Sequence, residues 1–543
     1  MGVRQRILRL LRPSHEHTEL SATVLLMAAV MLSRVIGYFR EAYIAYAFGA
    51  GHATDAYVAA FTLPDWLNYL VAGGTASITF IAIYTRFLAE KREDEAQKTF
   101  SVIITVMTVV LGIGIVLAEI FAAPIERRLF PHFDAGQLEL CVHLTRILLP
   151  AQVFFYVGGV VSAVLLSRRL FLLPAFGPLL YNVFIILGGV LLGNRIGIAS
   201  LAYGALFGSF VGPFLINAIG AKRVGTGYRP SFDLSNTAFR EWVKLSIPLM
   251  LGVSLVTADD WILRYFASGG AGDITRLNYA KRLFLVPIAV LGQATGQASL
   301  PFFARLFNEK RLQEFRETVN NSVYRITAVS FLTTAWMMAA ALPLIDLVYR
   351  RGRFHFSDSR ETALFFFWFA ISLAFWSAQA LYARAFYAAG DTLTPMIAST
   401  IITVASLPMY AALFQGFGVV GLTIASDVGI FANTAALALL LHRRKLVLTS
   451  ALPWKELGKA AFTSLFALVL SYGVARSVPL SGSRGADFLS LFLVSITWAA
   501  AVAMGLWATR SELPGALKQR GQRITYPHVA EKHAEEMSAG IEP

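Results

Sequence analysis

Residues 99–123 read TFSVIITVMTVVLGIGIVLAEIFAA, an apolar run in which Glu119 is the single charged residue. At 1.5 Å per residue, a helix of this length crosses the roughly 30 Å hydrocarbon core of a bilayer. Similar runs recur from Leu20 to Ala508, and the 543-residue chain is 56% hydrophobic and 15% charged. A soluble domain carries about 25% charged residues. The sequence therefore predicts an all-α, polytopic membrane protein, since the runs lack the alternation of a membrane barrel.

Apolar windows bounded by charge, proline or glycine predict about fourteen transmembrane helices. The second and eighth windows are long, and we expect Pro64 and Pro287 to break them. The shortest connection, Gly193–Gly197, separates the fifth window from the sixth. The predicted spans are 21–47, 55–87, 99–123, 138–167, 174–193, 197–220, 239–267, 275–306, 319–348, 361–388, 394–414, 418–441, 457–478 and 485–508.

The distribution of basic residues predicts which side of the membrane each loop faces. With the N-terminus in the cytoplasm, inside segments hold roughly three times as many Lys and Arg residues as outside loops. The basic loop 349–354 (YRRGRF) is the exception. Both termini are then cytoplasmic: 1–20 is a basic leader rather than a cleaved signal, and 510–543 is a flexible tail. This topology and attraction to anionic lipids explain the net charge of +14, so no nucleic-acid partner is expected.

Two parts of the chain resemble each other at a distance of about 220 residues. Residues 85–92 read TRFLAEKR and residues 304–311 read ARLFNEKR, and Pro174 and Pro395 precede Gly197 and Gly418 by the same spacing. The first six spans therefore match the next six, which is typical of transporters with a site between two rocking halves. The predicted divisions are an N-terminal lobe 21–220, a cytoplasmic linker 221–238, a C-terminal lobe 239–442 and two further helices in 443–509.

Basic residues inside the predicted spans are the strongest functional signal, because each costs about 2.5–3.5 kcal/mol near a helix centre. Arg34 lies deepest, and Gly37 leaves space between it and Arg40. Glu41 and Asp55 can neutralise these arginines when no substrate is bound. The full set is Arg34, Arg40, Arg146, Arg264, Lys281, Arg282, Arg325 and Arg384.

Lys281 and Arg282 occupy the corresponding span of the other half, so a cavity between the halves would be cationic from both sides. Arginine forks match phosphate oxygens bidentately, which predicts an anionic, phosphate-bearing substrate. A structural salt-bridge network is the alternative interpretation. For Arg146, Arg264 and Arg384, snorkelling to the interface is equally compatible.

No catalytic or nucleotide-binding motif occurs, so we expect a transporter rather than an enzyme, driven by an ion gradient or the membrane potential. Cys141 is the lone cysteine, which excludes an internal disulfide and a cysteine-based metal site. No cofactor is expected beyond a coupling cation, Na⁺ or H⁺. Asp259 and Asp260 are its candidate ligands, although Asp260 and Arg264 also have the spacing of a helical ion pair.

The segment Ser33–Glu41, SRVIGYFRE, resembles the SRxxGxxRD opening of the MurJ/MviN family. Residues 48–57 (FGAGHATDAY) and 61–64 (FTLP) continue that family's most characteristic stretch. Residues 174–178 (PAFGP) with Asn182, and 386–395 (FYAAGDTLTP), match further blocks. The similarity extends over most of residues 20–510.

The resemblance implies a flippase for lipid II, the undecaprenyl-pyrophosphate-linked peptidoglycan precursor, in the bacterial inner membrane. It implies the two-lobe fold of MATE exporters and polysaccharide flippases, with the two additional C-terminal helices forming a groove for the lipid tail. It assigns substrate-binding roles to Arg34, Arg40, Asp55 and Arg282, beside Lys281. Membrane lipids and the cell-wall synthesis machinery are the further partners that it implies.

The chain departs from the family pattern at several charged positions. Asn68 and Gly73 stand where the family usually has a basic residue and a glutamate. Leu285 replaces an acid that often follows the span-eight arginine, and Leu263 precedes Arg264 where many members have aspartate. Three alternatives therefore stay open: a flippase for another polyprenyl-linked glycan, a MATE-like ion-coupled exporter, and a non-transporting scaffold of cell-wall assembly.

Overall fold

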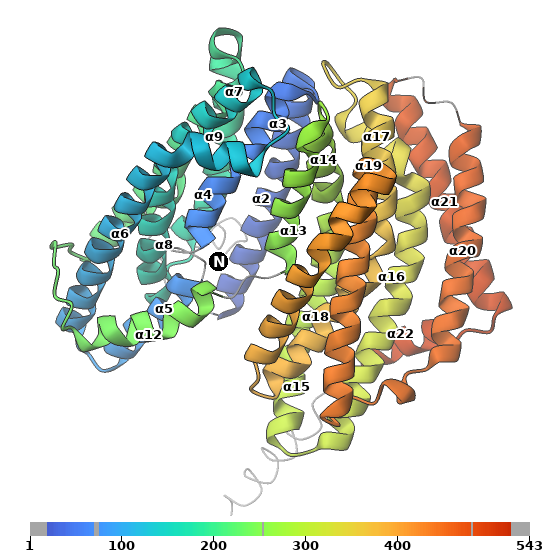
Figure 1. Ribbon diagram of the computed structural model, residues 1–543. Coiled ribbons are helices and arrows are strands. Elements are labelled where there is room, and N and C mark those ends of the chain that lie inside the picture. Colours follow the sequence, from blue (N-terminus) through green and yellow to red (C-terminus); the bar gives the residue numbers. More distant parts are fainter. Residues whose placement is uncertain (1–18, 70–74, 252–254, 479, 481, 523–543) are drawn as a thin grey trace, which may run out of the picture. The chain divides into compact units, whose positions relative to one another are not determined.

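The computed structural model describes residues 19–69, 75–251, 255–478, 480 and 482–522, and every regular element in these ranges is a helix. This confirms the predicted all-α class. The chain forms two compact units that interleave along the sequence (Figure 1). Unit 1 contains Met1–Ala280, Val348–Thr362 and Ser399–Leu422, and unit 2 contains Lys281–Leu347, Ala363–Ala398 and Thr423–Pro543. The division into lobes, linker and tail, which follows the sequence repeat, stays a prediction.

The helices of the first half follow one another with short connections. They are α2 (Glu19–Phe48), α3 (His52–Ala59), α4 (Thr62–Leu67), α5 (Thr75–Ala89), α6 (Glu93–Leu129), α7 (Ala135–Leu148), α8 (Ala151–Ser167), α9 (Leu172–Ile196), α10 (Ala199–Ser209), the π-helix η2 (Phe210–Ile216) and α11 (Asn217–Arg223).

The remaining helices continue to the end of the described chain. They are α12 (Thr237–Leu251), α13 (Leu255–Phe266), η3 (Ala267–Gly269), α14 (Asp273–Pro287), the π-helix η4 (Ile288–Ala294), α15 (Thr295–Asn308), α16 (Leu312–Tyr349), α17 (Phe356–Ile371), α18 (Leu373–Ala388), α19 (Leu393–Arg443), η5 (Thr449–Ala451), α20 (Trp454–Ser477), α21 (Arg484–Ala508) and α22 (Leu513–Gln522).

In the described residues, nine helical stretches are long and apolar enough to cross a membrane, or ten if the bent pair α17–α18 counts as one. The helix α19 holds two of the predicted spans, which meet at Gly418, where the backbone is not helical. The other three predicted spans coincide with α2, with α3 to α5, and with α12 and α13. The predicted count of about fourteen thus agrees roughly with the structure.

Prolines place the breaks inside the long spans. Pro64 lies in the first turn of α4, directly after the interruption between α3 and α4. Pro287 is the last residue of α14, and the π-helix η4 follows it. A proline has no N–H to donate and its ring clashes with the preceding turn, so the helix is interrupted or widened there. The predicted break near Pro64 is present, whereas at Pro287 the helix is widened to a π-helix and continues through α15 without a break.

The internal repeat is visible in the local backbone of each half. Gly197 and Gly418 adopt nearly the same conformation, with φ, ψ of 59°, −140° and 60°, −142°. Lys91 and Lys310 both have φ of 57°, in the left-handed region. Two more pairs of left-handed residues, Arg169 with Gly390 and Gly225 with Lys445, are separated by about 220 residues. Helices therefore end in the same turn geometry in both halves.

The turn before α19, in unit 2, is closed by an ion pair. Asp391 accepts hydrogen bonds from the backbone N–H of Thr394 at 2.9 Å and its hydroxyl at 2.6 Å, and it pairs with Arg444. Burial raises the pKa of Asp391, but the hydrogen bonds from Thr394 and Arg444 outweigh it and lower the pKa from 3.8 to about 2. The stabilisation by this carboxylate is therefore complete above pH 3.8 and disappears as the pH falls through about 2.

We expect Asp391→Ala to lower the thermal midpoint of the purified protein at pH 7. The free energy of unfolding should fall by about 1 kcal/mol, which is typical of a removed helix cap. The difference from wild type should shrink as the pH is lowered from about 4 towards 2, because wild-type Asp391 becomes protonated there. Glu139→Ala, at an exposed residue on α7, is the control and should move the midpoint little at either pH. An unchanged difference at low pH would contradict the ion-pair interpretation.

Each unit has its own apolar core. In unit 1, α5, α6, α8 and α12 enclose the aromatic residues Phe80, Phe100, Tyr156 and Trp242. In unit 2, α20 and α21 lie side by side and dock on α16. There Trp498 Nε1 donates to the carbonyl of Leu332 at 2.8 Å. The two helices outside the repeat are thus anchored to the second half.

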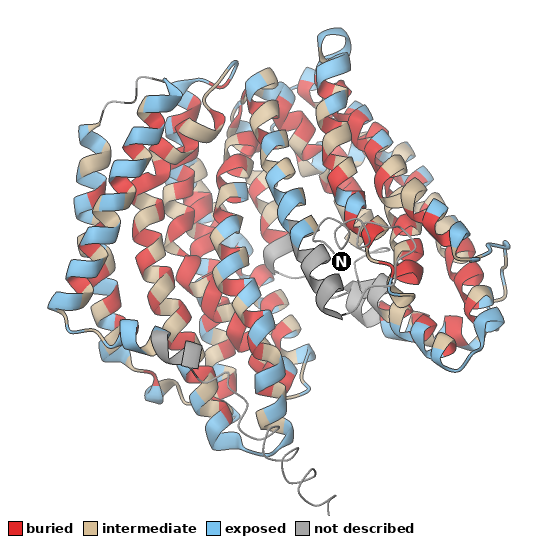
Figure 2. Cartoon of the chain, turned by 180° about the vertical axis from the view of Figure 1, so that it is seen from behind, coloured by how far each residue is buried: buried red, intermediate tan, exposed pale blue. Residues whose placement is uncertain are grey.

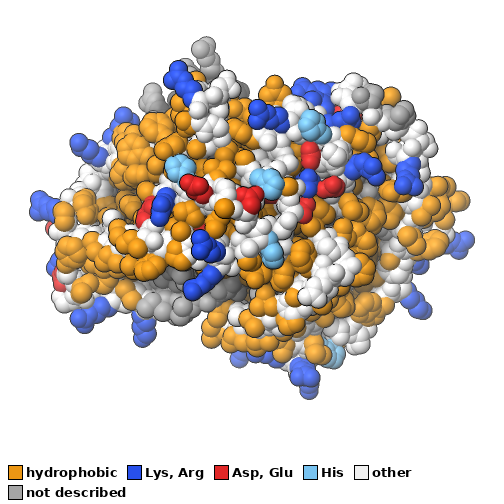
Figure 3. Space-filling model, turned by 45° about the horizontal axis from the view of Figure 1, so that its top comes forward, with side chains coloured by type: hydrophobic (Ala, Val, Ile, Leu, Met, Phe, Trp, Pro, Cys, Tyr) orange, Lys and Arg blue, Asp and Glu red, His pale blue; other side chains and the backbone are white. Residues whose placement is uncertain are grey.

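The outward faces of the long helices are apolar. On α6 they expose Val109, Ile113, Val116 and Ile120, and α9, α20 and α21 expose similar residues. Figure 2 shows buried residues on the inward faces and exposed ones along the outer helices. Broad areas of hydrophobic side chains reach the surface in Figure 3. Such a surface is solvated by lipid, which agrees with a multi-pass membrane protein.

Candidate substrate site

Arg40 lies inside unit 1, where α2 packs against α9. Its Nη1 donates a 2.8 Å hydrogen bond to Oδ1 of Asn182 on α9, and its Nη2 forms an ion pair with Glu41. The Arg40 side chain is 16% exposed and that of Glu41 is 7% exposed. Nε of Arg40 is buried and has no hydrogen-bond partner among the described residues. Contacts of the two Nη atoms thus orient the guanidinium, and its Nε–H donor forms no hydrogen bond within the described residues.

The same helix has open space at Gly37, about one turn before Arg40. A Cβ atom built at Gly37 would meet no atom within 4 Å, as predicted from the glycine between the two arginines. Arg34, further towards the N-terminus of α2, has an exposed side chain and no ion-pair partner among the described residues. The Arg40 guanidinium is therefore oriented and its charge is neutralised by Glu41, whereas the Arg34 guanidinium is exposed and forms no ion pair among the described residues. These are the two properties that an anion-binding surface needs.

Asp55 has a different environment from the one expected for a substrate ligand. Its carboxylate is fully buried and accepts hydrogen bonds from Gly272 N at 2.5 Å, Thr275 N at 2.8 Å and Thr275 Oγ1 at 2.6 Å. These donors belong to the first turn of α14 and the residue before it, so Asp55 caps that helix from a distant part of the chain. Its predicted role in substrate binding stays a prediction, and the geometry assigns it a structural one.

The acidic residues of α13 lie in a polar part of the bundle. Asp259 is buried and accepts a hydrogen bond from the hydroxyl of Tyr410, and Asp260 is half-buried. Arg264 bonds across helices rather than along its own: it donates to Thr62 Oγ1 at 3.1 Å and lies 3.6 Å from Asp65. Arg264 therefore belongs to a charge pair between α13 and α4, and the role of Asp259 and Asp260 as cation ligands stays a prediction.

Lys281 and Arg282 belong to unit 2, near the C-terminal end of α14. The Lys281 side chain is 8% exposed, whereas Arg282 is exposed. Adjacent positions on a helix point about 100° apart, which explains the difference. Their predicted contribution to a cavity between the two halves stays a prediction.

Two of the departures from the family pattern are Asn68, which the structure describes, and Gly73, which it does not. Asn68 donates from Nδ2 to Oε1 of Gln152 at 2.9 Å, so a neutral amide pair between two helices stands where a basic residue was expected. Gly73 lies outside the described residues.

Sequence reasoning missed the charge cluster around Arg276. This arginine pairs with Asp273 at 2.9 Å, Asp358 at 3.0 Å and Glu361 at 2.9 Å, and it joins α14 to the start of α17 within unit 1. Three carboxylates already neutralise its charge, which makes it a poorer candidate for a substrate anion than Arg40. The sequence held one usable signal, the i, i+3 spacing of Asp273 and Arg276.

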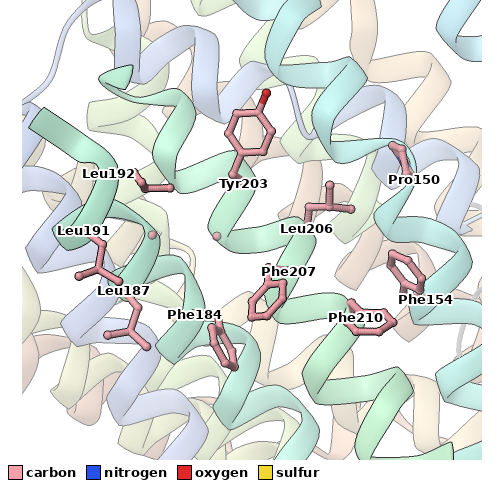
Figure 4. Close-up of a pocket in the computed structure, with 12 residues that line it drawn as sticks. Pro150, Phe154, Phe184, Leu187, Leu191, Leu192, Tyr203, Leu206, Phe207 and Phe210 are labelled. Atoms are coloured by element: carbon pink, nitrogen blue, oxygen red, sulfur yellow. The ribbon is translucent and has the colours of Figure 1, made fainter. Parts of the chain in front are cut away.

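A large cavity of unit 1 does not suit an anion. It has a volume of about 690 Å³ and lies between α8, α9, α10 and η2. Figure 4 shows the rings of Phe154, Phe184, Phe207 and Phe210 around it. Its lining contains no charged residue, so it fits a lipid chain and not a pyrophosphate. The Arg40 region is therefore the better candidate for the polar part of a substrate.

A family model described as lipid II flippase MurJ matches residues 44–492. This chain belongs to the MurJ family. The lipid II flippase MurJ of Burkholderia cenocepacia is 30% identical over 430 residues, which cover 76% of this chain and 82% of that protein. The probable lipid II flippase MurJ of Bdellovibrio bacteriovorus is 25% identical over 500 residues, or 90% of this chain and 94% of that protein. Family membership confirms the resemblance predicted from the sequence motifs.

Solved structures show the same fold. A lipid II flippase MurJ in an inward closed conformation superposes with a TM-score of 0.74 at 21% identity, covering 89% of this chain and 99% of that one. An inward-facing multidrug resistance MATE family transporter of the MOP superfamily gives a TM-score of 0.62 at 14% identity and covers 78% of this chain and 98% of that one. The fold is thus the one predicted, shared between MurJ proteins and MATE transporters.

Proposed function

We propose that this chain is a flippase that carries lipid II from the cytoplasmic to the outer leaflet of a bacterial cytoplasmic membrane. Membership of the MurJ family over residues 44–492 supports the substrate class. The structural observation that carries the proposal is Arg40, a largely buried guanidinium on the apolar helix α2 that is held by Asn182 and Glu41. No catalytic step is included in this activity.

The substrate pyrophosphate is the group that this arrangement fits. Asn182 and Glu41 fix one edge of Arg40 and keep its charge balanced when no substrate is present. An incoming pyrophosphate can take the remaining Nε–H and compete with Glu41 for the fork, because it offers more oxygens and more charge. Arg34 adds a second cation on α2, and Lys281 with Arg282 add charge from the second half as it rocks against the first.

Both termini are proposed to be cytoplasmic, and the left-handed residues support this orientation. Each falls in a loop or at a helix end, and most loops contain one. At the predicted outer loops all of them are glycine: Gly49, Gly197, Gly272, Gly352, Gly418 and Gly482. At the predicted cytoplasmic ends most are basic: Lys91, Arg169, Lys310, Lys445 and Arg510, beside Gly225 and Gly390. In the part of the chain that the structure describes, basic residues adopt this unfavourable conformation only on the predicted cytoplasmic side, which agrees with the bias of the positive-inside rule.

A cation, Na⁺ or H⁺, is proposed to couple transport to the membrane potential through Asp259 and Asp260. Asp259 is buried against Tyr410, and Asp260 precedes the Arg264–Asp65 pair by one turn. Carboxylates at membrane depth are the usual ligands or proton carriers of secondary transporters.

The polyprenyl chain is proposed to lie along the two C-terminal helices. A groove of about 1000 Å³ runs beside the end of α21 and the start of α22, in unit 2. Most of its lining is apolar, including Trp498, Val502, Leu506 and Trp507. The cell-wall synthesis machinery, which uses lipid II on the outer surface, is a further proposed partner.

The experiment that tests the proposal is complementation of a bacterium depleted of its lipid II flippase. Expression of this chain is expected to restore growth and normal cell shape, with membrane levels checked by immunoblotting. An exporter of small drugs would instead confer efflux without restoring growth. Failure to rescue despite normal membrane levels would contradict lipid II as the substrate and favour another polyprenyl-linked glycan.

A further inference from the structure

A polar cavity of about 350 Å³ lies in unit 1, where α8 ends and α9 begins. The ends of α5 and α11 and the beginning of α6 complete its wall. Its lining combines two arginines, one acid, a serine and three aliphatic side chains, namely Leu88, Glu93, Ser167, Arg168, Arg169, Leu170 and Val224. All of these residues lie at helix ends that the topology places on the cytoplasmic side. The cavity is therefore separate from Arg40 and from the apolar pocket of Figure 4.

The charges in this cavity are not balanced within the protein. Arg168 reaches Glu93 through a single long contact of 3.4 Å, and its Nε is buried without a hydrogen-bond partner in the described structure. Arg169 is exposed and has no ion-pair partner among the described residues. Lys222 and Arg223, in the last turn of α11 beside Val224, are exposed as well. The site thus has an excess of guanidinium donors.

The backbone shows that Arg169 is not the residue that the turn itself prefers. Arg169 has φ of 61°, and the matching residue of the second half, Gly390, has φ of 78°. Glycine adopts this left-handed conformation without strain, whereas another residue does so at a cost of about 1 kcal/mol or more. Keeping an arginine here carries that cost, and among the described residues its side chain forms no hydrogen bond or ion pair that would offset it.

The second half shows how the same turn is completed when no ligand is needed. There Asp391, at the position of Leu170, pairs with Arg444, at the position of Val224. The Arg444 guanidinium also lies over the Phe386 ring, 5.4 Å from its centroid. In the first half both positions are aliphatic, and the cavity lies where the second half has its ion pair. One copy of the turn is closed by its own side chains and the other is left open to an anion.

We propose that this cavity binds the phosphate group of an anionic phospholipid of the cytoplasmic leaflet, such as phosphatidylglycerol. Arg168 and Arg169 hold the phosphate oxygens, because a guanidinium fork matches them in geometry and charge. Leu88, Leu170 and Val224 lie against the glycerol and the first acyl carbons, which a free phosphate would not use. The negative surface of that leaflet concentrates such lipids at basic helix ends.

Native mass spectrometry of the detergent-purified chain, titrated with phosphatidylglycerol or phosphatidylcholine, tests this site. We expect wild type to bind phosphatidylglycerol in preference to phosphatidylcholine. Arg169→Gly should lower the affinity for phosphatidylglycerol roughly tenfold, the effect of one lost charge-assisted hydrogen bond. This variant has the glycine that the second half uses, so a folding defect is not expected. Lys310→Gly, which makes the same backbone change elsewhere, should bind as wild type does.

A second variant and a competition experiment with inorganic phosphate distinguish a lipid site from a site for a free anion. Arg168→Gln should also weaken phosphatidylglycerol binding, and millimolar inorganic phosphate should leave the bound lipid in place. The proposal is overturned if both arginine variants bind phosphatidylglycerol like wild type. It is equally overturned if inorganic phosphate displaces the lipid, because the site would then be one for a free anion.

Discussion

Arg40→Ala is expected to abolish complementation of a flippase-depleted strain while the protein still reaches the membrane. Among the described residues, the substitution removes the one basic side chain of α2 that is oriented by hydrogen bonds, through Asn182 and Glu41. Charge-assisted hydrogen bonds contribute about 1.5–3 kcal/mol each. The loss of two such bonds to the substrate pyrophosphate should therefore lower the affinity roughly 100-fold or more. Growth under depletion, and lipid II appearing on the outer surface, are the measurements.

Arg146→Ala is the matched control for this prediction. Arg146 is also an arginine within a predicted span, but its side chain is 49% exposed and lies 3.9 Å from Glu119. Its removal should leave complementation intact. Arg40→Lys keeps the charge but loses the planar fork, and it should restore activity only in part.

A purely structural role for Arg40 can be separated from substrate binding by a double variant. Removing Arg40 alone takes away the guanidinium that balances the charge of the buried Glu41, which can itself destabilise the protein. Arg40→Met combined with Glu41→Gln removes both charges and restores packing. If Arg40 contacts the substrate, the double variant is stable but inactive. Recovery of flipping by the double variant would contradict the assigned role.

The fold could be predicted largely from the sequence, because the bilayer imposes a strong and local constraint. Apolar length, proline positions and glycine turns lie in continuous segments, so the break near Pro64, the irregularity at Pro287 and the turns at Gly197 and Gly418 could be predicted. The repeat was detectable for the same reason. The π-helices were not, since they depend on how neighbouring helices accommodate a proline.

The candidate site could be predicted only in part, because its contacts join distant segments. The spacing of Arg34, Gly37 and Arg40 is local, and the open space at Gly37 agreed with it. The bond from Arg40 to Asn182 depends on the packing of α2 against α9, which no spacing reveals. Arg264 shows the limit most clearly: its i, i+4 neighbour suggested a helical pair, and the structure joins it to Asp65 instead.

The same limit explains why Asp55 was assigned to the substrate. Near two arginines in sequence, an aspartate at membrane depth indicates a counter-ion, and the family motif pointed the same way. In the structure its oxygens are occupied by donors more than two hundred residues away along the chain. A short polar motif therefore identifies a residue that matters without showing whether it binds the ligand or holds the scaffold.

Asp55→Ala is expected to lower the free energy of unfolding by about 3 kcal/mol or more, a larger loss than removal of an exposed helix cap causes. It leaves three donors of the α14 N-terminus buried and unsatisfied, each at a cost of about 1–3 kcal/mol. The thermal midpoint of the purified protein, and its yield in the membrane, should both fall. Thr275→Val, which removes one of the three donors together with its need for a partner, should have a much smaller effect.

Asp134→Ala is the control, because it removes a helix cap that is exposed to solvent. It separates the cost of losing a cap from the additional cost of leaving buried donors unsatisfied. Asp134 caps α7 through one bond to Gln137 N at 2.8 Å, and its side chain is 62% exposed, so water replaces it when it is removed. The expected loss is about 1 kcal/mol. If Asp55→Ala instead melts like wild type and loses only flipping, Asp55 acts on the substrate and not on α14. A joint loss of midpoint and yield, with any residual folded protein still binding lipid II, would establish it as part of the scaffold that holds α14 beside α3.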